Sequence, residues 1–146
     1  MIFVTVGTGK FEKLVKAADE LAEKIKEKVI IQKGKSKYEV KFAESFEFTT
    51  EFDDYVKKAR VIISHGGAGT IYLLLEKGKK VIGLANLNRI DKHQEEILEQ
   101  LDKQGYLLYC KDFNLEDYLN KLKKTKLKKY KKPGFWIDEK IKEFLG

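Results

Sequence analysis

Short apolar runs alternate with longer amphipathic stretches from the second residue onward, and this alternation limits the possible folds more than any other feature of the chain. The apolar runs have the length of buried strands and lie at residues 2–6, 29–32, 60–64, 80–84 and 106–110. Stretches with helical spacing lie between them, at residues 11–28, 52–58, 70–77, 91–103 and 115–123. This order predicts an α/β fold with a doubly wound, mainly parallel sheet, whose ligands bind at the carboxyl ends of the strands.

The segment 38–50 is less regular, and we expect it to hold one further strand with turns. Its aromatic residues Phe42, Phe46 and Phe48 are expected in the core or at a partner interface, not as a platform for stacking bases. With 146 residues the chain suits one domain. We assign residues 1–120 to that domain and expect the basic segment and a C-terminal helix, in residues 121–146, to pack on it.

Cysteine usage and the start of the chain bear on location. Cys110 has no partner cysteine, so there is no disulfide framework and a reducing interior is the default. The apolar start at residues 1–6 is too short to span a membrane, and it lacks the basic lead and cleavage region of a signal peptide. We therefore expect a cytoplasmic protein.

A glycine-rich turn follows the apolar run at residues 61–64 and opens a helix. The turn reads His65-Gly66-Gly67-Ala68-Gly69-Thr70, so backbone N–H groups can approach a ligand closely and the positive end of the helix points at the same spot. This arrangement suits a phosphate. The alternative is that His65 only caps a turn at the end of its strand; the neighbouring glycines favour phosphate contact.

A second polar cluster follows the next apolar run and holds Asp91, His93 and Gln94. The carboxyl ends of neighbouring parallel strands lie at one edge of the sheet, so these groups could meet the rest of the same ligand. Phosphate next to a hydroxyl-rich group suggests a nucleotide sugar. For Asp91 a helix-capping role is equally compatible with the pattern, and for His93 a solvated position in the first helical turn is slightly favoured.

These motifs, in this order and spacing, resemble the C-terminal, donor-binding domain of glycosyltransferase family 28, which is half of a GT-B fold and Rossmann-like. The resemblance covers most of residues 1–120 and rests on the opening at residues 3–8, the turn at 64–70, Gly78-Lys79 before a strand, and Asn86 followed by residues 91–94. Within the family the chain resembles the soluble subunit of the two-part UDP-N-acetylglucosamine transferase of dolichol-linked oligosaccharide synthesis, and small subunits of bacterial exopolysaccharide glycosyltransferases.

The resemblance implies a role for each motif. The first loop would lie on the donor side, the glycine turn would hold the diphosphate of a UDP-sugar, and the second cluster would line the sugar. The implied donor-binding residues are Gly7, Thr8, His65, Gly66, Gly67, Ala68, Gly69, Thr70, Asn86, Asp91, His93 and Gln94. The family needs no metal or other cofactor, because helix dipole and N–H groups stabilise the departing UDP, and the chain has no Asp-x-Asp metal motif.

The implied activity is an inverting hexosyl transfer, of N-acetylglucosamine or a similar sugar, from a UDP-sugar to a lipid-linked sugar acceptor. One donor domain supplies one wall of the cleft, so a membrane-anchored glycosyltransferase subunit is expected to supply the other wall and the catalytic base. The chain would then be inactive alone and peripheral at the cytoplasmic membrane face through its partner. Whether it forms a homo-oligomer when alone stays open.

Two residues depart from the family pattern. Leu73 stands where a glutamate commonly binds the ribose hydroxyls, and Glu76 could substitute only if the helix were shifted or the side chain reached back. Lys80 replaces the usual proline before the next strand. Leu73 motivates a second hypothesis, a non-catalytic nucleotide-sugar-binding regulatory subunit; a self-associating structural domain is a third.

Basic residues are concentrated at residues 121–132, within a chain of net charge +7. A solvated surface explains such a run most simply. Functionally, a polybasic segment is attracted to anionic lipid or to an acidic partner, at about 1 kcal/mol per basic residue near a charged membrane. No nucleic-acid recognition motif accompanies the charge, so we expect no nucleic-acid partner.

Overall fold

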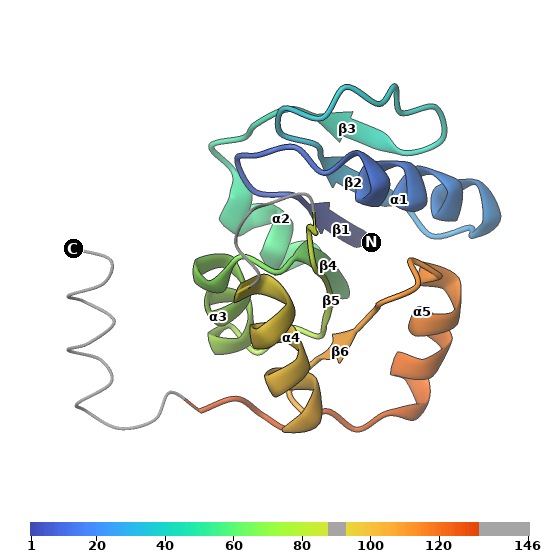
Figure 1. Cartoon of the computed structure of the whole chain (residues 1–146). Coiled ribbons are helices and arrows are strands. Elements are labelled where there is room, and N and C mark those ends of the chain that lie inside the picture. The colour runs from blue at the N-terminus through green and yellow to red at the C-terminus, as the bar shows by residue number, and fades with distance from the viewer. Residues whose placement is uncertain (88–92, 132–146) are drawn as a thin grey trace.

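The computed structural model describes residues 1–87 and 93–131, which form one parallel sheet with helices on both faces (Figure 1). The strand order is β3-β2-β1-β4-β5-β6, and all neighbouring pairs are parallel. The strands are β1 Ile2–Thr5, β2 Val29–Gln32, β3 Glu44–Phe46, β4 Val61–His65, β5 Val81–Leu84 and β6 Leu108–Tyr109. The predicted α/β fold with a doubly wound parallel sheet is therefore confirmed.

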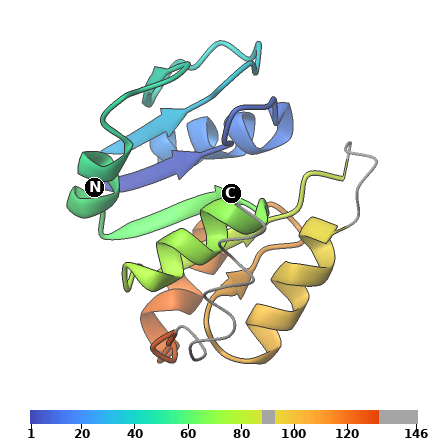
Figure 2. The same ribbon diagram turned by 90° about the vertical axis from the view of Figure 1, so that its left-hand side faces the viewer.

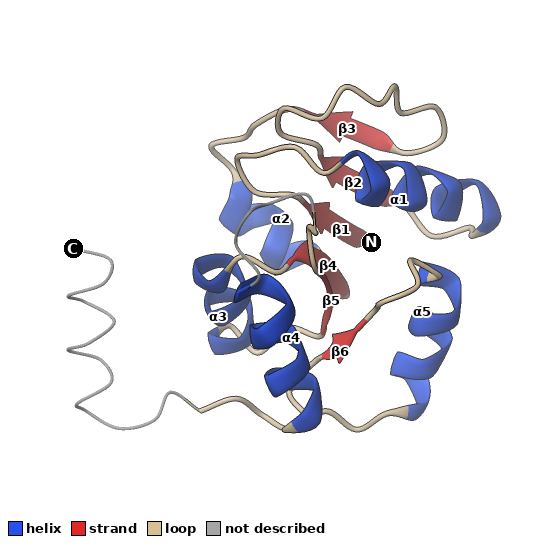
Figure 3. Cartoon of the chain, in the orientation of Figure 1, coloured by secondary structure: helices blue, strands red, loops and turns tan. Residues whose placement is uncertain are grey.

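The helices divide between the two faces of the sheet, as Figure 3 shows with helices in blue and strands in red. Their bounds are α1 Glu12–Lys24, α2 Phe52–Lys58, α3 Ala68–Glu76, α4 His93–Lys103 and α5 Leu115–Lys124. The buried residues of α1 and α5 share one core layer with Ile2 and Val4. Those of α2, α3 and α4 form the other layer with Phe3.

The central strand β1 shows why the sheet must be covered on both sides. All four of its residues are buried, with Phe3 facing one layer and its neighbours Ile2 and Val4 the other. The Phe3 ring stacks on Tyr55 of α2 at 5.3 Å and meets Phe52 edge-on at 5.7 Å. A strand buried on both faces reads as a continuous apolar run, which is the pattern in the sequence.

The irregular segment 38–50 yields one short strand, β3, held by a carboxylate on α1. Asp19 is fully buried and accepts hydrogen bonds from the backbone N–H groups of Lys41, Phe42 and Ala43 at 2.9, 2.8 and 3.1 Å. Burial raises the pKa of Asp19, but these donors and the Tyr38 hydroxyl outweigh it, so the pKa lies below its usual value. The carboxylate therefore fixes a segment with little hydrophobic pattern of its own.

The aromatic residues of this segment have different environments. Phe46 lies in β3 and packs on Tyr55, with ring centroids 5.1 Å apart, as expected of a core residue. Phe42 and Phe48 are instead 53% and 51% exposed. Of the two expected locations, the core is therefore excluded for Phe42 and Phe48, and a role at a partner interface stays a prediction.

Several sequence expectations differ at element ends or fall outside the described residues. The first helix ends at Lys24, not at residue 28, and β6 is reduced to Leu108–Tyr109. The fourth helix is described from His93. Asp91 and the expected C-terminal helix lie outside the described residues. In the part that is described, no helix is long and apolar enough to cross a membrane.

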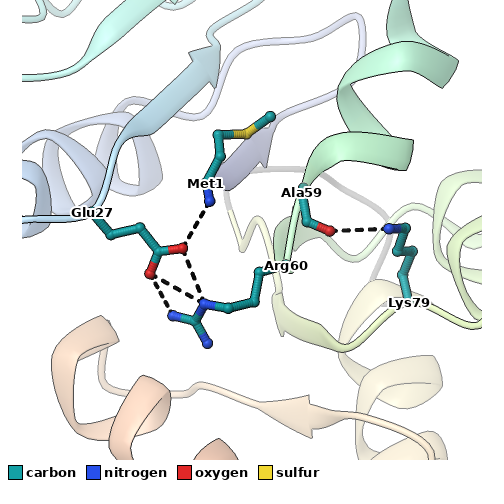
Figure 4. Close-up of polar contacts among 5 residues, drawn as sticks. All are labelled: Met1, Glu27, Ala59, Arg60 and Lys79. Atoms are coloured by element: carbon teal, nitrogen blue, oxygen red, sulfur yellow. Dashed lines mark hydrogen bonds and ion pairs between the residues drawn. The ribbon is translucent and has the colours of Figure 1, made fainter.

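The amino edge of the sheet is fastened by ion pairs and hydrogen bonds (Figure 4). Glu27, just before β2, accepts from the Met1 amino group at 2.8 Å and from the guanidinium of Arg60, just before β4, at 2.6 Å. The hydrogen bonds from Arg60 hold the pKa of Glu27 near 2 despite partial burial. Lys79 Nζ donates to the Ala59 carbonyl at 3.0 Å. This edge therefore carries structural contacts, and the opposite edge carries the loops with the candidate functional residues.

Candidate functional site

Three loops meet the carboxyl edge of the sheet, toward which the arrowheads of β1 and β4 point in Figure 2. They follow β1, β4 and β5 and contain the predicted residues Gly7 and Thr8, the turn at 65–70, and Asn86. β1, β4 and β5 are adjacent in the sheet. The topology therefore brings together residues that are far apart in the sequence.

The first loop turns at Gly7, which has a positive φ of 72°. Its N–H donates to Thr5 Oγ1 at 3.2 Å, and that hydroxyl donates to Gln32 Oε1 at 3.0 Å. Thr5 and Gln32 are both buried. Thr8 follows with an exposed side chain. The fixed turn thus presents Thr8 to solvent at the edge where the other loops end.

His65 ends β4 and is only 8% exposed. Its Nδ1 accepts a hydrogen bond from the Gly67 N–H at 3.2 Å, so the neutral ring carries its proton on Nε2. A Cβ at Gly7 would lie 2.6 Å from Nε2, and one at Gly67 would overlap the same ring. Both glycines are required because the imidazole occupies the space that their side chains would take.

The N-terminus of α3 supplies unused backbone donors. The first hydrogen bond of the helix joins Ile71 N to Gly67 O at 3.0 Å. The N–H groups of Ala68, Gly69 and Thr70 precede it, and none has an acceptor within residues 1–87 and 93–131. A Cβ built on Gly69 meets no atom of the described residues within 4 Å. An anion can therefore approach these donors and the positive end of the helix dipole.

Gln94 of α4 joins two of the loops. Its Oε1 accepts from Gly66 N at 3.2 Å and from Asn86 N at 3.0 Å, and the residue is 7% exposed. The Gly66 N–H is therefore already satisfied, as is that of Gly67 through His65. Within the glycine turn, the backbone donors left for a phosphate are therefore those of residues 68–70. Contact of Gln94 with a sugar stays a prediction; such a contact would use the N–H groups on Nε2, because Oε1 already accepts two hydrogen bonds.

The other residues predicted to line a sugar occupy distinct positions. Asn86 donates through Nδ2 to the Lys10 carbonyl at 2.9 Å, which ties the loop after β5 to the loop after β1. His93 starts α4 with a side chain that is 78% exposed, 3.6 Å from Glu96. Leu73, where the resemblance leads one to look for a carboxylate, is 39% exposed on α3.

Nucleophilic and metal chemistry have little support at other positions. Burial, reinforced by Asp112, raises the pKa of the Cys110 thiol to about 12, so it stays protonated. In the described ranges, no three His, Cys, Asp or Glu side chains are grouped so that they could hold a metal ion. The metal-independence implied by the resemblance stays a prediction.

The sequence did not single out Thr5, Gln32 or Lys10 as parts of this edge. Thr5 and Gln32 are the last residues of β1 and β2, and their hydrogen bond appears only once the two strands are paired in register. Polar residues that end otherwise apolar runs were the available signal. Lys10 contributes only its backbone carbonyl, which no residue pattern could reveal.

Comparisons with known proteins agree with the fold and the motifs. The model of the glycosyltransferase family 28 C-terminal domain matches residues 1–143. The chain is 34% identical over 122 residues to the human UDP-N-acetylglucosamine transferase subunit ALG13, covering 75% of this chain and 11% of that protein. The ALG13 subunit of Candida albicans is 34% identical over 76 residues, which cover 52% of this chain and 26% of that one.

Two solved structures share the fold. A solution NMR structure of ALG13 matches with a TM-score of 0.62 at 21% identity, over 96% of this chain and 93% of that chain. The glycosyltransferase SnogD from Streptomyces nogalater matches with a TM-score of 0.57 at 18% identity, over 83% of this chain and 33% of that chain. Because the family model extends over nearly the whole chain, the chain belongs to the family of the glycosyltransferase family 28 C-terminal domain.

Proposed function

We propose that this chain is the donor-binding subunit of an inverting glycosyltransferase, which moves N-acetylglucosamine or a similar sugar from a UDP-sugar to a lipid-linked acceptor together with a membrane-anchored partner. One observation carries the proposal: at the N-terminus of α3, the N–H groups of Ala68, Gly69 and Thr70 have no acceptor among the described residues, and none of these lies within 4 Å of a Cβ built on Gly69. Three aligned donors at a helix end suit a diphosphate.

The same donors would act on the departing group. In an inverting transfer the acceptor oxygen forms a bond to the anomeric carbon while the bond to the UDP oxygen breaks, and a base takes the acceptor proton. Negative charge then accumulates on the diphosphate, where helix-end N–H groups stabilise it most. No base is assigned to this chain, and we place that base on the partner.

The names of the relatives support the choice of donor and the two-part enzyme. Both the human and the Candida albicans relatives are called UDP-N-acetylglucosamine transferase subunits. The chain spans only 11% and 26% of their lengths, so their substrate and assembly are carried to this chain as part of the proposal.

Leu73 favours a second candidate, a regulatory subunit that binds a nucleotide sugar without transferring it. An apolar side chain on α3 cannot accept hydrogen bonds from ribose hydroxyls. Without these hydrogen bonds the affinity for the nucleoside would be lower. The two candidates share the phosphate site and differ in whether transfer follows binding.

Calorimetric titration with UDP-N-acetylglucosamine, UDP-glucose and UDP tests the binding step. The variant Gly69→Val places a branched side chain in the open space before the helix end and is expected to abolish binding, while the helix tolerates valine at least as well as glycine. Gln100→Val, on the exposed side of α4, is the matched control and should bind normally. His65→Ala should also weaken binding. Equal binding by both valine variants would refute the phosphate site.

Transfer is tested by adding the protein to membranes from the cells that make it and following radiolabelled sugar into the lipid extract. Label that enters lipid only when protein and membranes are combined supports the two-part transferase. Donor binding without any label in lipid would favour the regulatory candidate. Efficient transfer by the pure protein to a lipid acceptor would contradict the need for a partner.

A further inference from the structure

A basic groove lies at the amino edge of the sheet, on the far side from the candidate donor loops. It is about 520 Å³ in volume and lies between the turn from α3 to β5 and the segment that leaves α5. Among the described residues, Lys79, Lys80 and five lysines between residues 123 and 129 line it, and no Asp or Glu does. We call this feature the lysine groove. β5 has four residues, so three steps of about 3.3 Å place its two ends, and with them the two edges of the sheet, roughly 10 Å apart.

The walls of the lysine groove are fixed by contacts to the body of the protein. The ring of Tyr130 lies 5.9 Å from Tyr72 and 5.3 Å from Tyr106. The backbone N–H of Lys128 donates to the Gly105 carbonyl at 2.8 Å. On the other wall, Lys79 Nζ donates to the carbonyls of Lys57 and Ala59 at 3.1 and 3.0 Å. The groove is thus part of the folded structure, although its sequence is a polybasic run.

Its lysines are clustered, and no described carboxylate neutralises them. Four described lysines elsewhere pair with carboxylates, among them Lys28 with Glu44 at 3.3 Å and Lys111 with Glu99 at 3.1 Å. In the described part of the chain no groove lysine forms an ion pair. Lysines that repel one another without counter-charge favour the binding of an anion.

We propose that the lysine groove binds an extended acidic segment of a partner polypeptide. A concave site admits a chain, whereas a flat membrane would reach only its rims. A membrane at this edge would also hold the donor loops away from a lipid-linked acceptor. Nucleic acid is disfavoured because Tyr106 and Tyr130 pack edge to face against each other and do not present a stacking surface, and because the basic residues are lysines without the planar fork of arginine.

The groove and the donor loops lie at opposite edges, so an acidic partner and a UDP-sugar could bind at the same time. The inference does not depend on the donor being bound. Its failure and that of the proposed function are separable, because each uses different residues and a different probe.

Fluorescence anisotropy with a labelled decapeptide of alternating aspartate and glutamate tests the inference on the full chain. The variant Lys126→Glu/Lys128→Glu/Lys129→Glu reverses charge on one wall, and Lys16→Glu/Lys24→Glu/Lys41→Glu makes the same change in net charge at exposed positions elsewhere. We expect the groove variant to lose at least tenfold in affinity and the control variant to lose less than threefold. Both variants should keep the thermal unfolding midpoint and donor binding of the parent.

Equal losses in the two variants would overturn the inference, because the peptide would then respond only to net charge. Two competitor arms identify other occupants. The competitors are vesicles of phosphatidylserine and phosphatidylcholine and a single-stranded oligonucleotide. If one of them binds the parent through the groove lysines while the peptide does not, the ligand of the groove is lipid or nucleic acid, and the inference is overturned.

Discussion

The side-chain oxygen of Gln94 lies 3.2 Å from the backbone nitrogen of Gly66 and 3.0 Å from that of Asn86. One acceptor on α4 therefore holds the loops after β4 and β5 in a fixed relation. Its two hydrogen bonds occupy N–H groups that would otherwise be open to a phosphate. They also leave the helix end at residues 68–70 as the supply of free N–H groups in the described turn. Gln94 thus positions the site whether or not it touches a sugar.

Replacing this oxygen should destabilise the fold. Gln94→Leu would leave the Gly66 and Asn86 N–H groups without an acceptor, and we expect a loss of about 2–3 kcal/mol in the free energy of unfolding, since a buried unsatisfied donor costs about 1–3 kcal/mol. Urea denaturation measures this loss. Gln94→Glu retains the acceptor oxygens and should recover part of the lost stability. A leucine variant as stable as the parent would show that the two hydrogen bonds to Gln94 do not stabilise the fold.

Gly7 and Gly9 provide a matched pair in the first loop. Gly7→Ala adds a methyl group 2.6 Å from His65 Nε2 at a backbone φ of 72°, and it should destabilise the protein by about 1–3 kcal/mol and weaken UDP binding. Gly9→Ala meets nothing within 4 Å and should change stability by less than about 0.5 kcal/mol. Denaturation and calorimetry of the two variants give the comparison, and equal effects would contradict the packing of the imidazole on Gly7.

The contacts of Glu27 predict a pH dependence of stability. Its folded pKa is about 2, below the ordinary value of 4.5, so its stabilisation is complete above about pH 4.5 and is lost as the pH falls toward 2. Allowing for solvent screening, we expect about 1–2 kcal/mol. Glu27→Gln should remove this part of the profile when unfolding is followed between pH 2 and pH 7.

Glu44 gives the control for that profile. It pairs with Lys28 on the surface, and both side chains are more than half exposed. Glu44→Gln should leave the profile nearly unchanged, because exposed pairs contribute little. A variant of Glu44 with the larger effect would mean that the amino-edge contacts of Glu27 are not what stabilises the protein at neutral pH.

The sequence predicts the elements that are held by hydrophobic burial, but not the contacts that single polar side chains make. The strands predicted at residues 29–32 and 60–64 are confirmed, because burial on both faces leaves a continuous apolar run in the sequence. The residue pattern of segment 38–50 does not predict its structure, because the segment is held by Asp19, a buried carboxylate on a helix about 20 residues earlier in the chain. The lysine groove could not be foreseen either, since its two walls are brought together only by the fold.

The same limit applies to the candidate site. The glycine turn at 65–70 is recognisable in the sequence, because glycines before a helix indicate backbone N–H groups that an anion can approach. The sequence could not show that Gln94 accepts from backbone N–H groups, because backbone partners leave no mark in residue identity. The number of donors open to a phosphate therefore had to come from the structure.

Leu73 offers a gain-of-function prediction. Leu73→Glu places a carboxylate on α3 at an exposed position, where the resemblance implies contact with ribose hydroxyls. Hydrogen bonds to a charged group contribute about 1.5–3 kcal/mol, so UDP should bind roughly tenfold or more tightly. Titration with uridine diphosphate and its 2′-deoxy analogue checks the cause, because the deoxy compound should gain less. An equal gain for both would place the new carboxylate away from the ribose 2′-hydroxyl.

The most direct measurement is an amide NMR titration of the ¹⁵N-labelled protein with UDP-N-acetylglucosamine, set beside free N-acetylglucosamine. We predict that the amide signals of Ala68, Gly69 and Thr70 shift most with the nucleotide sugar and hardly at all with the free sugar. Saturable shifts at those three amides would place the diphosphate at the N-terminus of α3. Shifts centred on the lysine groove, with those amides unmoved, would contradict the donor site.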